Sequence, residues 1–145
     1  MQFERILIVA NDSPSSLKAV KYGYTLAAEL GAKVALLGVV DETLTEGNVD
    51  AGIFPDEAAR QLKEKLELFL HQLARDYANG VDTEIFTPEG EIIQTILQTA
   101  SKWDAQLIVV GTHGRTGLNR LLMGSMAEDI LRHSTIPVFI VPIDK

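Results

Sequence analysis

Glycines gather after one apolar run of the chain, in a pattern that suits an anion-binding loop. Three glycines stand within the seven residues 111–117, directly after the apolar residues 107–110. Glycines at this density cost backbone entropy, but they permit positive φ and let another group approach the main chain closely. Nine residues separate Gly114 from Gly124, and Ser125 follows at once.

Ser125 and Glu128 fit the S-x-x-E capping box that opens a helix. A strand, a glycine loop and a helix N-terminus in this order form an anion site, because free backbone N–H groups and the positive end of the helix dipole face the ligand. Arg115 and Arg120 add mobile positive charge nearby. The plainer alternative is that the glycines only shape a tight turn and Ser125 only caps its helix.

A second polar group follows the first apolar run. Asn11 and Asp12 carry short side chains that could receive ribose hydroxyls, an adenine amine or a phosphate-bound cation. The alternative is that Asp12 or Ser13 simply caps the first helix.

The elements that must position these residues alternate along the chain. Continuous apolar runs predict strands covered on both faces, as in a parallel sheet, at residues 6–10, 34–40, 107–110 and 138–141. A fifth, alternating run at residues 83–87 predicts a half-exposed strand. Helices are predicted over residues 14–30, with Gly31 as the stop, and over residues 55–79, 89–102 and 125–133.

Spacings of three and four residues predict the buried side of each helix. The predicted inward residues are Leu17, Val20, Tyr24, Ala27 and Leu30, then Leu62, Leu66, Phe69, Leu73 and Tyr77, then Ile92, Ile96, Leu97 and Ala100, and last Ile130 and Leu131. The fold class is therefore α/β: one domain over residues 1–145, with an open, doubly wound, five-stranded parallel sheet and helices on both faces. Residues 41–54 are acidic and irregular, and they are either a mobile flap or a plain surface loop.

Composition excludes several classes of function. The 145 residues contain no cysteine, which removes disulfides, zinc–thiolate sites and thiol nucleophiles. The net charge of −7 disfavours nucleic-acid binding. No apolar run is long enough for a membrane span and no secretion signal opens the chain, so we expect a cytoplasmic protein without a membrane partner.

Motifs of the common nucleotide enzymes and hydrolases are missing. The sequence has no P-loop, no dinucleotide G-x-G-x-x-G and no G-x-S-x-G elbow. His113 is the one candidate base near the loop, although a turn role suits it better. We expect His71 on a solvated helix face and His133 at a helix C-terminus. No metal site and no catalytic residue is predicted.

The spacing Gly111-x2-Gly114-x9-Gly124-Ser125 resembles the nucleotide loop of the universal stress protein family, in its ATP-binding branch. The resemblance covers nearly the whole chain, and its other matching segments are residues 6–9, 32–41, 109–115 and 136–141. It implies an adenine nucleotide alpha hydrolase-like fold. It also implies a homodimer in which the last strand pairs with its twin.

The resemblance implies ATP as the ligand, with ADP and AMP as alternatives and Mg²⁺ or Mn²⁺ held only through the phosphates. Val39 would line the adenine pocket and Val110 would border the sugar. With the polar residues named above, the predicted nucleotide contacts are Val9, Ala10, Asn11, Asp12, Val39, Val110, Gly111, Gly114, Arg115, Gly124, Ser125 and Met126.

One departure from the family concerns Asn11, where the family usually has an aspartate. A neutral amide can bond adenine or ribose, but it cannot hold a cation as a carboxylate does. The leading hypothesis is a stress-response protein that senses adenine nucleotide and is not an efficient enzyme. The alternatives are a slow Mg²⁺- or Mn²⁺-dependent ATP hydrolase and a nucleotide-free dimeric interaction protein.

Overall fold

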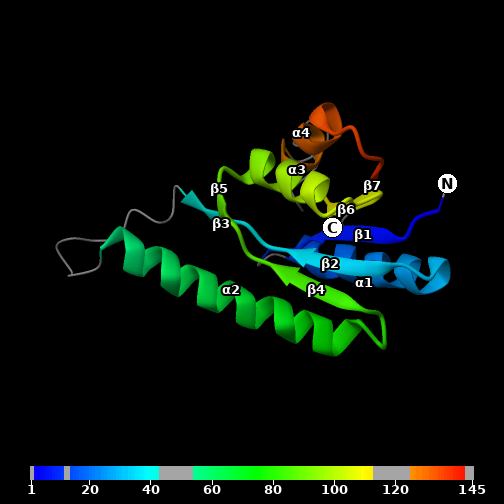
Figure 1. Cartoon of the computed structure of the whole chain (residues 1–145), viewed down its shortest axis with the longest axis horizontal. Helices are drawn as coiled ribbons and strands as arrows, with labels where there is room; N and C mark the ends of the chain where they lie inside the picture. Colours follow the sequence, from blue (N-terminus) through cyan, green and yellow to red (C-terminus); the bar gives the residue numbers. More distant parts are fainter. Residues whose placement is uncertain (1, 12–13, 43–53, 113–124, 143–145) are drawn as a thin grey trace.

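The computed structural model describes residues 2–11, 14–42, 54–112 and 125–142, and these form a parallel sheet with helices on both faces (Figure 1). The strands are β1 (Arg5–Val9), β2 (Lys33–Leu37), β3 (Val40–Asp41), β4 (Thr83–Phe86), β5 (Glu89–Gly90), β6 (Leu107–Gly111) and β7 (Val138–Val141). The helices are α1 (Pro14–Leu30), α2 (Pro55–Tyr77), α3 (Ile92–Lys102) and α4 (Ser125–His133).

The main sheet has five strands in the order β4-β2-β1-β6-β7, and every pair is parallel. This confirms the predicted α/β fold class. β1 lies at the centre, and the chain passes from it to β2 on one side and later to β6 on the other. The central strands are buried, whereas each residue of β4 is half-buried, as its alternating pattern predicted.

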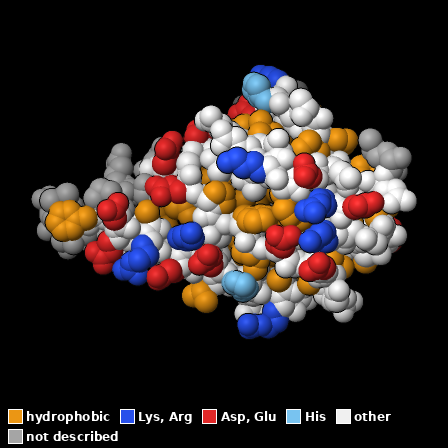
Figure 2. Space-filling model, viewed as in Figure 1, with side chains coloured by type: hydrophobic (Ala, Val, Ile, Leu, Met, Phe, Trp, Pro, Cys, Tyr) orange, Lys and Arg blue, Asp and Glu red, His pale blue; other side chains and the backbone are white. Residues whose placement is uncertain are grey.

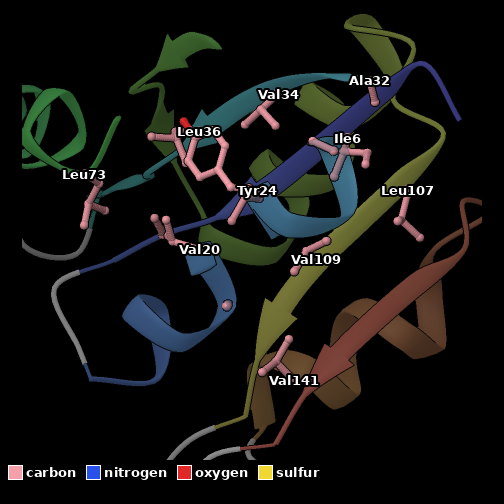
Figure 3. Close-up of a cluster of buried hydrophobic side chains, with 14 of the residues drawn as sticks. Ile6, Val20, Tyr24, Ala32, Val34, Leu36, Leu73, Leu107, Val109 and Val141 are labelled. Carbon is pink, nitrogen blue, oxygen red and sulfur yellow. The ribbon is translucent and has the colours of Figure 1, made fainter. Parts of the chain in front are cut away.

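One face of the sheet packs against α1 and α2. Figure 3 shows this cluster of buried side chains, with Val20 and Tyr24 from α1 and Leu73 from α2 against Ile6 and Val34 of the sheet. Alternate strand residues point to this face because successive side chains of a strand point to opposite sides.

The other face packs against α3 and α4. Ile96 and Ala100 of α3 and Ile130 of α4 lie against Leu7 and Ile108 of the sheet, and all five are buried. The helix pattern was wrong for three predicted inward residues. Leu17, Leu30 and Leu131 are 39%, 48% and 48% exposed, because each lies at the edge of its helix's contact with the sheet.

α2 also differs in detail from the prediction. Its most buried residue is Leu70, at 0% exposure, which the predicted stripe omitted. Leu66, Phe69 and Tyr77 are only partly buried at the rim of the cluster. Leu68 is 73% exposed on the outer side of the helix.

A short two-stranded sheet was not predicted. The predicted second strand, residues 34–40, breaks after Leu37, and Val40–Asp41 pairs instead with Glu89–Gly90 as β3 and β5. The third helix therefore begins at Ile92 and not at residue 89. Glu91 caps it, since its carboxylate accepts from the backbone N–H groups of Ile93 and Gln94 at 3.0 and 2.9 Å.

Gly38 lies at the break between β2 and β3, where α2 passes close to the main chain. Its N–H donates to the carbonyl of Phe86 at 3.0 Å. A Cβ at this position would lie 2.9 Å from both methyl groups of Leu66. The absence of a side chain at residue 38 therefore lets α2 pack directly on the end of β2. None of the described helices is long and apolar enough to cross a membrane.

Candidate functional site

The strand order reverses between β1 and β6, which defines the place where open α/β sheets bind ligands. The register pairs Ile8 with Val109, so the next residues along, Val9 and Val110, are also side by side at the carboxyl ends of the two strands. Two of the predicted contacts, from segments 101 residues apart in the sequence, are thus brought together at one edge of the sheet. The chain leaves β1 for α1 on one face and resumes after β6 at α4 on the other (Figure 1).

Four predicted contacts belong to the hydrophobic cluster on the α3 and α4 face of the sheet. Val9 and Val110 are buried at 5% and 0% exposure, and Val39 and Met126 pack against the same cluster while remaining partly exposed. They come from β1, β6, the segment between β2 and β3, and the first turn of α4. Because Val9 and Val110 are buried in the core, the apolar surface that could lie against a base comes from Val39 and Met126.

Ala10 and Gly111 contribute main chain to the edge. The side chain of Ala10 belongs to the cluster under α1, on the opposite face from Val9. Its N–H continues the ladder by donating to the carbonyl of Leu37 at 2.8 Å. Gly111 is the last residue of β6, one residue beyond the predicted strand, and it pairs with Val141. The backbone is therefore fixed up to the last residues before the glycine loop.

The turn from β1 into α1 is held by a serine that the sequence analysis did not single out. The backbone N–H of Asn11 donates to Oγ of Ser16 at 2.8 Å, and this hydroxyl donates in turn to Oδ1 of Asn11. Ser16 is 4% exposed. The first bond holds the backbone of the turn and the second orients the side-chain amide, so Ser16 positions Asn11 at the predicted ligand edge. A serine near the start of a helix carried no signal for this role, since such residues usually cap the helix.

The segment after β2 closes one side of the edge. Val40 N–H donates to the carbonyl of Pro88 at 2.8 Å, and β3 then pairs with β5. Val39 is held between the last residue pair of β2 and this short sheet. Its position is thus fixed by backbone bonds on both sides.

The phosphate half of the predicted site falls largely outside the described residues. Asp12, Gly114, Arg115 and Gly124 lie there, as do His113 and Arg120. Ser125 is the first residue of α4. The carboxylate of Glu128 accepts from Nη2 of Arg132 at 2.7 Å, four residues along the helix. The predicted capping box stays a prediction, because the side chain of Ser125 lies outside the described part of the chain.

Two histidines occupy the places predicted for them. His71 is exposed on α2. His133 is exposed at the last residue of α4, and its Nδ1 lies 3.0 Å from the carbonyl oxygen of Asp129. His71 lies on an element that supplies no predicted contact, and His133 lies at the opposite end of α4 from Met126. Within the described residues, no group of three His, Asp or Glu side chains is placed to hold a metal ion.

A hollow of about 890 Å³ lies at the amino ends of the strands, away from the candidate site. Phe3, Gly31 and Asp82 are among the residues that line it, and all flank the amino ends of the strands. Ligands of open α/β sheets bind at the carboxyl ends, so this hollow is not the candidate site in spite of its size.

The fold is an open α/β sheet, and its candidate ligand site lies at the topological switch point between β1 and β6. The model of the universal stress protein family matches residues 2–142, and the chain belongs to this family. Universal stress protein MJ0531 of Methanocaldococcus jannaschii is 32% identical over 146 residues, which cover 96% of this chain and 82% of that protein. Universal stress protein YxiE of Bacillus subtilis is 31% identical, with coverage of 96% and 99%.

Solved structures show the same fold. The structure of MJ0577 aligns with a TM-score of 0.85 at 23% identity, covering 100% of this chain and 99% of that chain. A universal stress protein in complex with cAMP aligns at 0.71 and 20% identity, with coverage of 98% of each chain. The universal stress protein of Archaeoglobus fulgidus in complex with dAMP aligns at 0.63 and 18% identity, covering 97% of this chain and 98% of that one.

Proposed function

We propose that this chain binds an adenine nucleotide, ATP in the first place, at the carboxyl edge between β1 and β6. The observation that carries the proposal is that Val9 and Val110 lie side by side at the switch point of the sheet, while Val39 and Met126 pack against the same core cluster and stay partly exposed. An adenine base has two apolar faces and polar edges. Such a cluster, with a polar turn beside it, fits a ligand of that kind.

The neighbouring groups suit the rest of a nucleotide. Asn11 stands at the turn where a ribose hydroxyl or an adenine edge could bond. The glycine loop and the N-terminus of α4 suit the phosphates, because backbone N–H groups and the helix dipole favour anions. Two related structures with the same fold were solved with cAMP and with dAMP, both adenine nucleotides.

The same site favours sensing over rapid catalysis. Fast phosphoryl transfer needs a metal-binding carboxylate and a group that positions the attacking water. Residue 11 is a neutral asparagine, so it does not supply the metal-binding carboxylate. We therefore propose a cytoplasmic regulator in the stress response whose state depends on bound nucleotide, with slow Mg²⁺- or Mn²⁺-dependent hydrolysis as the alternative.

The first test is to purify the protein without added nucleotide, denature it and identify any released small molecule by mass spectrometry. We expect ATP close to one per chain. Release of ADP would favour the hydrolase alternative. If nothing is released and no adenine nucleotide raises the melting temperature in a titration with and without Mg²⁺, the chain is a nucleotide-free interaction protein and the proposal fails.

A pair of matched variants locates the site. Val39→Phe fills the space where the base is proposed to lie. Val81→Phe enlarges another half-buried valine, which lies at the amino ends of the strands. We expect Val39→Phe to weaken ATP binding about tenfold or more, because the phenyl ring would take the space of the base and the packed surroundings cannot move enough to restore it. Val81→Phe should leave ATP affinity unchanged even if it lowers stability. Equal loss in both variants would place the nucleotide elsewhere.

We also propose that the protein forms a homodimer through β7. This strand is at the edge of the sheet, and Phe139 on it is 36% exposed. Exposed apolar edges need cover to prevent uncontrolled pairing. Phe139→Lys should convert the dimer to a monomer in sedimentation experiments. A wild-type protein that is already monomeric would contradict this part of the proposal.

A further inference from the structure

The β4 side of the sheet, across from β7, carries a cleft that the proposed nucleotide site does not use. β4 is the outermost strand on that side and pairs only with β2 among the described residues. A cleft of about 620 Å³ opens along its carboxyl half, between α2 and α3. In Figure 2, which shows the molecule from the side of β4, hydrophobic side chains gather in the middle of the face between the two helices, with charged side chains around them.

The main chain of β4 can accept another strand at this cleft. Asp82 and Phe86 direct their carbonyl groups to β2, where they accept from Val34 at 2.8 Å and from Gly38 at 3.0 Å. Because main-chain groups alternate in direction along a strand, those of Thr83 and Ile85 point away from the sheet. An edge with unpaired groups is a template for an extended segment of another chain.

The amino half of β4 is protected by charge. Glu84 accepts from the indole N–H of Trp103 at 3.1 Å and lies 3.1 Å from Nζ of Lys33, and these two contacts hold the pKa of Glu84 below its ordinary range. Asp82 lies 3.8 Å from the same lysine. Charged side chains of this kind discourage pairing at a sheet edge. The cleft begins just beyond them, at Ile85.

The carboxyl half has the opposite character. The rings of Phe86 and Trp103 meet edge to face, with centroids 6.3 Å apart, and form an apolar wall. Lys63 of α2 and Lys102 of α3 flank it, and neither forms an ion pair with any described residue. The third charged residue of the lining, Glu67, accepts from the hydroxyl of Thr87 at 3.3 Å. Two unpaired cations therefore face an apolar wall in a chain whose net charge is −7.

We propose that this cleft binds an extended, acidic peptide segment of a partner protein, which adds to the sheet as a strand alongside β4. The peptide main chain would pair with the outward groups of Ile85, and an apolar side chain would rest on Phe86 and Trp103. A carboxylate of the peptide would meet Lys63 and Lys102, where charge complementarity favours an anion. A second copy of this chain fits less well, because its own α2 and α3 flank its β4 and would meet these helices.

Trp103 makes the proposal directly measurable, because it is the only tryptophan of the chain and lines the cleft. The probe is a pool of synthetic peptides with valine or leucine at alternate positions and aspartate or glutamate between them. We expect members of the pool to change the fluorescence of Trp103 saturably. Peptides with lysine in place of the acidic residues should have no effect. If no acidic member of the pool changes the fluorescence, the proposal is wrong.

Variants and modified peptides then test the mode of binding. Lys63→Ala should weaken binding about fivefold, and the double variant Lys63→Ala, Lys102→Ala should weaken it further, as expected for solvent-accessible charge pairs. Lys65→Ala is the matched control, since Lys65 is exposed on the same helix and does not line the cleft. Lys65→Ala should leave binding unchanged. Equal effects of Lys63→Ala and Lys65→Ala would show that the peptide is attracted to any lysine of α2, and this would overturn the proposal.

Methylation of alternate peptide nitrogens separates strand addition from simple anion binding. The methylated peptide keeps its charge and side chains but cannot donate to β4, so we expect binding to be lost. Undiminished binding of the methylated peptide, or equal competition by free N-acetyl-aspartate, would show a small-anion site and refute strand addition. A second copy of this chain is the other occupant to be tested, by sedimentation of the Lys63→Ala, Lys102→Ala double variant. If the wild type is a dimer and this variant is a monomer, the cleft binds a second copy and the proposal is wrong.

Discussion

Ser16 offers the sharpest test of how the fold presents the candidate site. Its hydroxyl makes two hydrogen bonds to Asn11, one to the backbone N–H and one to the side-chain oxygen, and it is 4% exposed. Ser16→Ala removes both bonds and leaves a partly buried backbone N–H without this acceptor. Each bond contributes about 1 kcal/mol net, so we expect a loss of about 2 kcal/mol in the free energy of unfolding. For a chain of this length the melting temperature should fall by about 6 °C.

Urea denaturation of matched variants measures this loss. Ser101→Ala is the control, because Ser101 is exposed at the end of α3, and it should change stability by no more than about 0.5 kcal/mol. A double-mutant cycle with Asn11→Ala isolates the bond between the two side chains and should give a coupling of about 1 kcal/mol. If Ser16→Ala costs no more than Ser101→Ala, the turn is not held as described.

The same variant links the turn to the proposed ligand. If Asn11 contacts the nucleotide, loss of its orienting partner should lower the affinity for ATP in Ser16→Ala, while Ser101→Ala binds normally. An unchanged affinity in a destabilised Ser16→Ala protein would separate the structural role of the turn from ligand binding.

Other predictions concern the core and the titratable groups. Leu70→Ala should cost about 3 kcal/mol by leaving a cavity, whereas Leu68→Ala, at an exposed position on the same helix, should stay within about 0.5 kcal/mol in denaturation experiments. The bonded Glu84 carboxylate has a lowered pKa, so its contribution to the free energy of unfolding is present above about pH 4.3 and is lost as the pH falls through the pKa of the folded state. The stability difference between wild type and Glu84→Gln should therefore shrink on acidification. A difference that grew would contradict the reasoning. Burial raises the pKa of Tyr24 more than its bond to the Thr83 hydroxyl lowers it, so its contribution is present below about pH 10 and is lost above that value. Alkaline titration should therefore destabilise wild type more than Tyr24→Phe, and parallel curves would argue against this.

The sequence predicted the main sheet because continuous apolar runs identify strands that are covered on both faces. It did not predict β3 and β5, since each has two residues and neither is apolar throughout. Their pairing depends on how the chain leaves β2 and β4, which is a tertiary property. The burial of Leu70 and the exposure of Leu131 have the same origin: spacing defines an apolar side of a helix, but the contact with the sheet decides which part of that side is covered.

The nucleotide contacts follow from the resemblance and stay predictions. Val9, Val39, Val110 and Met126 are among them, and all four belong to the hydrophobic cluster on the α3 and α4 face of the sheet. Ser16 was missed because a hydroxyl gains its role from the geometry of a turn and not from spacing. The loop that would hold phosphates lies outside the described residues, so its contacts stay predictions.

Gly38 has a consequence for how this protein can change during evolution. Because a Cβ at residue 38 would lie 2.9 Å from both methyl groups of Leu66, the two positions share one small volume. A larger residue at 38 is compatible with this packing only if residue 66 becomes smaller, or if α2 moves away from the end of β2. Relatives that keep the packing should therefore vary at these two positions together, and a glycine at the first should accompany a leucine or a residue of similar size at the second.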